Sequence, residues 1–109
     1  MFAVIYQGYL KPGREEEYLQ AWHQIATYFV NHRGAIGSCL HKAEDGKWIA
    51  YSRWPDKATR DASWPTGENA PSKELPIEIQ QAILQIKDCI DQDKKLPDIC
   101  MEVVRDLLY

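Results

Sequence analysis

Three polar side chains on two expected strands have the types that acid–base and oxyanion chemistry needs. Tyr51 and Arg53 are two residues apart, so on a strand they share one face. A tyrosine hydroxyl can bind a substrate oxygen, and a guanidinium can stabilise a developing enolate or phenolate. His41 is the candidate general base, because an imidazole titrates near neutral pH. The sequence therefore predicts His41, Tyr51 and Arg53 as catalytic residues.

Each of these residues also has an ordinary structural interpretation. Tyrosine and arginine are enriched at subunit interfaces, so the residue types on the face of Tyr51 and Arg53 favour contact with a partner. His41 would then be a polar strand residue near a hairpin. With Cys39 on the same face it supplies only two metal ligands, so we expect no metal site.

Aromatic and amide side chains form a second group, suited to holding a flat organic ligand. Trp54 and Trp64 flank a corner where a strand is followed at once by a helix, and large rings there suit the wall of a pocket. The alternative is that both rings only pack the helix against the sheet. Gln7 is a polar residue in an apolar strand, so it belongs either to the site or to a cross-strand network. The predicted substrate-binding residues are Gln7, Trp54 and Trp64.

The composition excludes several function classes. A chain of 109 residues forms one domain, 1–109, and its net charge of −3 offers no basic surface for nucleic acid. No apolar run approaches the ~20 residues of a membrane span, and the N-terminus lacks the features of a signal peptide. Three widely spaced cysteines, Cys39, Cys89 and Cys100, indicate reduced, mostly buried thiols in a cytoplasmic protein.

The periodicity of apolar residues predicts the elements that position these side chains. Pro55 ends a strand because it cannot donate to a ladder, and Asp56 suits the N-cap of the next helix. The segment 65–76 holds three prolines and is either a lid or an ordinary connection. The expected strands are 2–9, 35–42, 48–54 and 99–104, and the expected helices are 15–32, 56–64 and 77–93.

The order of these elements, β-α-β-β-α-α-β, is that of an α+β, ferredoxin-like fold with an extra helix before the last strand. Its antiparallel sheet carries its helices on one face. Strand 2–9 is apolar on both sides, which is typical of a strand in a sheet with both faces covered. One small domain cannot cover the second face with its own helices. We therefore expect a homodimer in which two sheets pack face to face.

Several local features together resemble one known family. The first strand leads into Lys11-Pro12-Gly13, and the next helix begins with three glutamates and Tyr18 and carries Trp22. A hairpin follows, and Tyr51-Ser52-Arg53-Trp54 leads into a capped helix. Over nearly the whole chain this resembles the antibiotic biosynthesis monooxygenase domain of the dimeric α/β-barrel superfamily.

The resemblance implies two activities, one for each branch of the family. One branch oxidises aromatic polyketide-like or quinol substrates with O₂ and without metal, flavin or other cofactor, using electrons that substrate deprotonation supplies. The other degrades haem and uses an Asn late in the first strand, a Trp on the helix after the third strand and a later His as iron ligand. Trp64 matches that Trp, but Tyr6 stands near the Asn position and no His follows Trp64. Haem degradation is therefore disfavoured.

The resemblance thus implies a cofactor-independent monooxygenase acting on a small aromatic molecule. In that mechanism His41 removes a phenolic proton while Trp54, Trp64 and Tyr51 hold the ring. The rival expectation is a non-catalytic dimeric protein, a ligand-binding or stress-related one, that uses the same pocket. Convergence of Gln7, His41, Tyr51 and Arg53 on one cavity would favour catalysis, and scatter over an interface would favour the binding protein.

Overall fold

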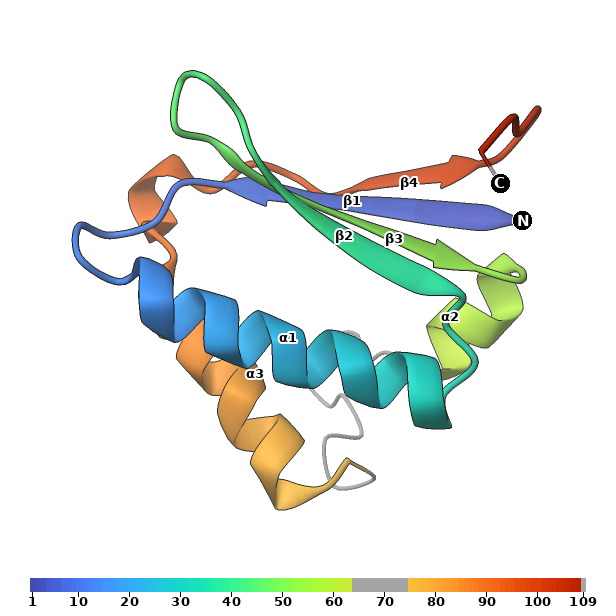
Figure 1. Cartoon of the computed structure of the whole chain (residues 1–109), viewed down its shortest axis with the longest axis horizontal. Helices are drawn as coiled ribbons and strands as arrows, with labels where there is room; N and C mark the ends of the chain where they lie inside the picture. Colours follow the sequence, from blue (N-terminus) through green and yellow to red (C-terminus); the bar gives the residue numbers. More distant parts are fainter. Residues whose placement is uncertain (64–74, 109) are drawn as a thin grey trace.

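Strand β1, Phe2–Gly8, lies inside an antiparallel sheet (Figure 1). Within residues 1–63 and 75–108, which the computed structural model describes, this sheet has four strands in the order β2-β3-β1-β4. The element order and the antiparallel pairing confirm the predicted α+β, ferredoxin-like fold. The other elements are α1 (Glu15–His32), β2 (Gly37–Lys42), β3 (Trp48–Trp54), α2 (Lys57–Ser63), α3 (Ile77–Cys89), the 3-10 helix η2 (Gln92–Lys94) and β4 (Ile99–Glu102).

The two faces of the sheet have different surroundings. Helix α1 lies along one face, and α3 packs against α1 on that same side (Figure 1). The buried core is there: Val4 of β1 is fully buried, and Ile25 and Phe29 of α1 belong to the same cluster. No described helix covers the other face, which we call the open face. Because successive strand residues point to opposite sides, each strand supplies one set of side chains to the core and one to the open face.

The corner after β3 forms as the sequence predicts. Trp54 ends the strand, and the Asp56 Oδ1 accepts the backbone N–H of Thr59 at 2.7 Å, which is an N-cap of α2. Trp64 and most of the segment 65–76 lie outside the described residues. The sequence predicts this segment as either a lid or an ordinary connection.

Helix α3 is shorter than predicted because the residues after it pair with the segment that follows β1. It ends at Cys89 instead of residue 93. Ile90 forms a bridge with Leu10, and the N–H of Asp91 donates to the carbonyl of Tyr9 at 2.8 Å. These contacts with the segment after β1 replace further helical hydrogen bonds, and only a short 3-10 turn follows. A local apolar pattern cannot anticipate this competition.

The cysteines correct one expectation from the sequence. Only Cys89 is buried, whereas Cys39 and Cys100 are exposed. Cys39 lies on the open face, and Cys100 lies on the edge strand β4, where it pairs with Val4. Burial raises the pKa of the Cys89 thiol, which keeps this group protonated at neutral pH.

Candidate functional site

A cavity of about 100 Å³ lies between the sheet and α1. We call it the helix-side cavity. Its wall is strongly aromatic, because β1, β3 and α1 each turn large rings toward the core side of the sheet. The aromatic lining residues are Tyr6, Tyr18, Trp22, Phe29 and Trp54. Phe29 packs edge-on against Trp54 with ring centroids 6.1 Å apart, a geometry that aromatic pairs prefer.

One buried donor in this cavity has no partner. The indole N–H of Trp54 makes no hydrogen bond to any described residue, although only 4% of the residue is exposed. Buried donors in native proteins are nearly always paired, so an unpaired one points to a missing acceptor. The hydroxyls of Ser38 and Ser52, 2.7 Å apart, also belong to lining residues, but they satisfy each other across β2 and β3. Trp54 lines the cavity, and its unpaired N–H is covered by protein atoms, so an oxygen of a bound molecule reaches this donor only when the ring or its neighbours shift.

Tyr6 of the cavity wall is hydrogen-bonded to a buried arginine of α2. Arg60 of α2 is nine-tenths buried, and its Nη2 donates to the hydroxyl of Tyr6 at 3.1 Å. Burial raises the pKa of Tyr6 while Arg60 acts in the opposite sense, so the phenol is neutral at neutral pH. Burial likewise raises the pKa of Tyr18 to about 12. Both cavity phenols therefore act as hydrogen-bonding groups and not as bases.

The sequence-predicted catalytic residues lie on the other side of the sheet. His41, Tyr51 and Arg53 line a hollow of about 750 Å³ on the open face. Trp54 lines the helix-side cavity, so the sheet separates it from the three predicted catalytic side chains. The expected meeting of His41 and Trp54 in one pocket does not occur within this chain.

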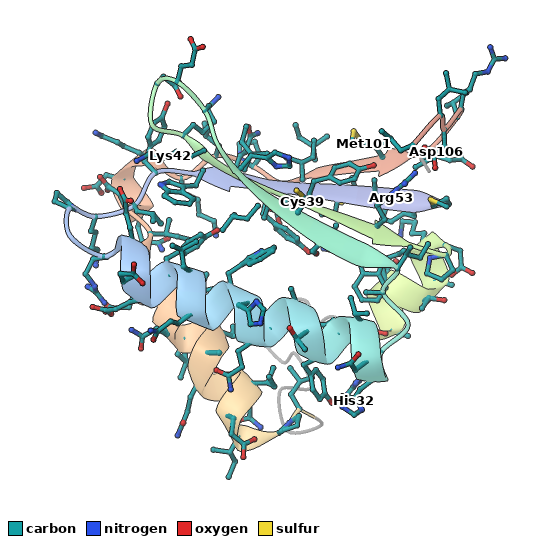
Figure 2. The ribbon with its side chains drawn as sticks, in the orientation of Figure 1. His32, Cys39, Lys42, Arg53, Met101 and Asp106 are labelled. Carbon is teal, nitrogen blue, oxygen red and sulfur yellow. The ribbon has the colours of Figure 1, made fainter. Side chains whose placement is uncertain are left out.

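The open-face hollow has its own polar contacts. Arg53 forms an ion pair with Asp106 of the C-terminal segment, and both side chains are turned toward one another on the side away from the helices (Figure 2). The N–H of Leu108 and then Arg53 hold the pKa of Asp106 below its usual range. His41 Nδ1 lies 3.2 Å from the carbonyl of Ile49, its cross-strand neighbour. Arg53 and His41 thus each contact the protein itself, while the Nε of Arg53 is buried without a hydrogen-bond partner among the described residues.

Gln7 makes a hydrogen bond of the second predicted kind and also lines a further cavity beside Tyr6 and Tyr18, so both of its predicted alternatives stay open. Its side-chain Nε2 donates to the carbonyl of Pro97 at 3.1 Å, which ties β1 to the segment before β4. It lines neither the helix-side cavity nor the open-face hollow. Gln7 therefore does not converge with His41, Tyr51 and Arg53. Trp64, the remaining predicted substrate-binding residue, is outside the described part of the chain.

Sequence reasoning missed one lining residue of the helix-side cavity, Ser52, and one residue bonded to its wall, Arg60. Arg60 looks like a surface charge in a short helix, and no local pattern marks it as buried. Ser52 alternates with Trp54 and Ala50 on β3, so strand periodicity does place it on the same face as Trp54. That signal identifies the cavity-facing side of β3, but the burial of Arg60 depends on where α2 packs.

Two searches of the described residues concern metals and membranes. Among residues 1–63 and 75–108, no three His, Cys, Asp or Glu side chains gather to hold a metal ion. The same residues contain no helix long and apolar enough to cross a membrane. The expectation that no metal or other cofactor takes part stays a prediction.

Comparison with solved structures places the fold among known proteins. A crystal structure of an antibiotic biosynthesis monooxygenase is 18% identical with a TM-score of 0.69, covering 96% of this chain and 100% of that one. Rv0793 from Mycobacterium tuberculosis is 12% identical, with a TM-score of 0.68 and 98% of each chain covered. A variant of SnoaB, a cofactor-independent oxygenase from Streptomyces nogalater, is 9% identical with a TM-score of 0.70, covering 99% of this chain and 97% of that one. At these identities the likeness shows the fold alone.

Comparison of the sequence shows the family. No curated protein matches the chain. The family model described as antibiotic biosynthesis monooxygenase matches residues 1–63, which is more than half of the sequence and includes β1, α1, the β2–β3 hairpin and α2. The chain belongs to the antibiotic biosynthesis monooxygenase family.

Proposed function

We propose that this protein is a cofactor-independent monooxygenase that oxidises a small aromatic or quinol-like molecule with O₂ in the helix-side cavity. The observation that carries this proposal is the unpaired, buried N–H of Trp54 in an aromatic-lined cavity. A donor fixed in a dry site stabilises negative charge on a substrate oxygen far better than water does. Family membership and the oxygenase activity named for SnoaB, which has the same fold, support the choice of reaction.

The chemistry divides between the substrate and the cavity. The substrate loses a ring-hydroxyl proton to water, and a carbon of the resulting electron-rich anion forms a bond to O₂. The O–O bond then breaks, one oxygen stays on that carbon as a carbonyl, and the other leaves as water with the two hydrogens of that carbon, so that overall R₂CH₂ + O₂ gives R₂C=O + H₂O. The aromatic wall holds the ring and excludes water, while the N–H of Trp54 donates to the anionic oxygen. The described lining residues include no carboxylate and no imidazole; their titratable groups are Tyr6 and Tyr18, whose pKa values are raised. Substrates whose hydroxyl ionises readily in water are therefore preferred.

The lack of a carboxylate or imidazole among the described lining residues favours one alternative, a protein that binds an aromatic ligand without transforming it. Catalysis by His41, Tyr51 and Arg53, as predicted from the sequence, is a competing proposal in which the reaction takes place in the open-face hollow and not in the helix-side cavity. The cytoplasmic location predicted from the cysteines also remains a proposal.

Oxygen uptake by the purified protein tests the proposed function. The assay uses anthrone-like and hydroquinone-like compounds in the presence of a metal chelator and without flavin. We expect uptake above the autoxidation rate of each compound, and the most acidic hydroxyls should react fastest. Binding of these compounds without any uptake would favour the ligand-binding alternative.

We also propose that a second copy of the chain covers the open face. Ile5, Ile49 and Tyr51 lie there beside the hollow, and no described segment other than the C-terminal one reaches it. Replacing Ile49 by lysine places a charge in such an interface, and we expect the sedimentation-equilibrium mass to fall from two chains to one. Leu84→Lys, a change of the same kind at a side chain 64% exposed on α3, is the control and should leave the mass unchanged. A monomeric wild-type protein would contradict this proposal.

A further inference from the structure

The helix-side cavity is small for the ligand it is proposed to hold. Its volume is about 100 Å³. Pockets for organic ligands usually measure ~300 Å³ or more. A single substituted ring would nearly fill the space, so any larger substrate must extend somewhere else. The structure offers one direction in which it can do so.

A second cavity, of about 200 Å³, lies directly beyond the first. We call it the outer cavity. Tyr6 and Tyr18 line both cavities, so the two spaces adjoin at these residues. The ring of Tyr18 also packs edge-on against Trp48, which lines the outer cavity. Together the two spaces approach the lower end of the usual volume of a ligand pocket, roughly 300 Å³.

The two cavities differ in charge. The helix-side cavity is lined by aromatic, aliphatic and hydroxyl groups. The outer cavity is lined by Lys87 of α3 and by Lys95, with Asp98 as the carboxylate on its wall. Burial raises the pKa of Asp98, while Lys95 and Arg60 act in the opposite sense. With two ammonium groups and one carboxylate, the lining of the outer cavity carries a net positive charge.

Arg60 adds a third positive charge next to Tyr6, where the two cavities adjoin. Its guanidinium donates to the Tyr6 hydroxyl, and its Nε has no hydrogen-bond partner among the described residues. The nearest carboxylate in an ion pair with it is Asp61, at 3.4 Å from Nη1, and Asp61 also pairs with Lys57 at 2.6 Å. Arg60 also interacts electrostatically with Asp98, so its guanidinium adds positive charge next to Tyr6 without itself lining either cavity.

We propose that the two cavities are the two lobes of one site, and that its ligand is an aromatic anion. The ring occupies the helix-side cavity, and a negatively charged group attached to it reaches past Tyr6 and Tyr18 to Lys87 and Lys95. This inference rests on the proposed function, because it uses the same helix-side cavity, and it adds the class of substrate that the cavity selects. Oxygen chemistry is not needed for the binding itself.

Calorimetric titration with two matched probes tests the inference. The probes are 3-phenylpropionate, which carries a ring and a carboxylate, and 3-phenylpropionamide, which has the same shape and no charge. We expect the acid to bind the wild-type protein more tightly than the amide at low salt. Lys87→Glu and Lys95→Glu should each weaken binding of the acid by about threefold to tenfold. Neither change should alter binding of the amide.

Lys94→Glu is the matched control. It makes the same change of net charge next to Lys95, but the Lys94 ammonium lies over the ring of Tyr9, 5.9 Å from its centroid, and not on the wall of either cavity. The control should bind both probes as the wild type does. Equal affinity of the wild type for acid and amide, no binding of the acid, or equal losses in all three lysine variants would each overturn the inference. Charge-selective binding without oxygen uptake would leave it standing and remove only the monooxygenase.

Discussion

Replacing Phe29 by alanine is expected to lower the free energy of unfolding by about 3–5 kcal/mol. Phe29 is 4% exposed and contacts the rings of Tyr28 and Trp54 edge-on. Its removal opens a void next to a cavity that already exists, so the neighbouring side chains have little with which to fill it. Urea unfolding followed by tryptophan fluorescence measures the change, with the slope of the transition expected to stay constant.

Val30→Ala provides the control for this prediction. Val30 is the next residue on α1, and 41% of it is exposed. Its truncation should change the free energy of unfolding by no more than about 0.5 kcal/mol. A loss below about 1 kcal/mol for Phe29→Ala would mean that this ring does not hold the helix against the sheet in solution, because buried phenylalanines cost several times more.

Replacing Trp54 by phenylalanine is expected to reduce the turnover number by about 10²-fold. The change keeps an aromatic ring against Phe29 but removes the buried N–H, which has no partner among the described residues. If this N–H donates to the anionic oxygen of the substrate, its loss mainly destabilises the state in which charge develops. The turnover number should then fall by a larger factor than the affinity for substrate.

Trp22→Phe separates the lost donor from the lost ring volume. Trp22 lines the same cavity, but its N–H is not among the buried groups without a partner. The same loss of ring volume there should cost much less turnover. Unfolding curves for both variants show whether the protein remains folded during the assay. Equal losses in the two variants would assign the effect to packing and not to the Trp54 N–H.

The fold could be predicted from the sequence because its signals are local. The stripe on α1 and the Asp-Gly turn between β2 and β3 fix their elements without help from distant residues, and both agree with the structure. The end of α3 could not be predicted in the same way. It depends on the bridge between Ile90 and Leu10, which are 80 positions apart in the chain. Local patterns do not encode a pairing between such distant residues.

The candidate site was only partly predictable. Strand alternation already implies that Trp54 and Arg53 point to opposite faces, so the separation of Trp54 from the predicted catalytic residues was within reach of the sequence. The burial of Arg60 was not, because it follows from the packing of α2 near β1. The pairing of two cavities across Tyr6 and Tyr18 also needs the tertiary structure.

The most direct test of the central claim compares initial rates of oxygen uptake for the wild type, Trp54→Phe and His41→Ala. All three are assayed with the same hydroquinone-like substrate, with chelator present and flavin absent. If the reaction takes place in the helix-side cavity, the wild type exceeds autoxidation, Trp54→Phe loses most of that excess and His41→Ala keeps it, because His41 lines the open-face hollow. Loss of activity in His41→Ala with full activity in Trp54→Phe would contradict the account and move the chemistry to the open face.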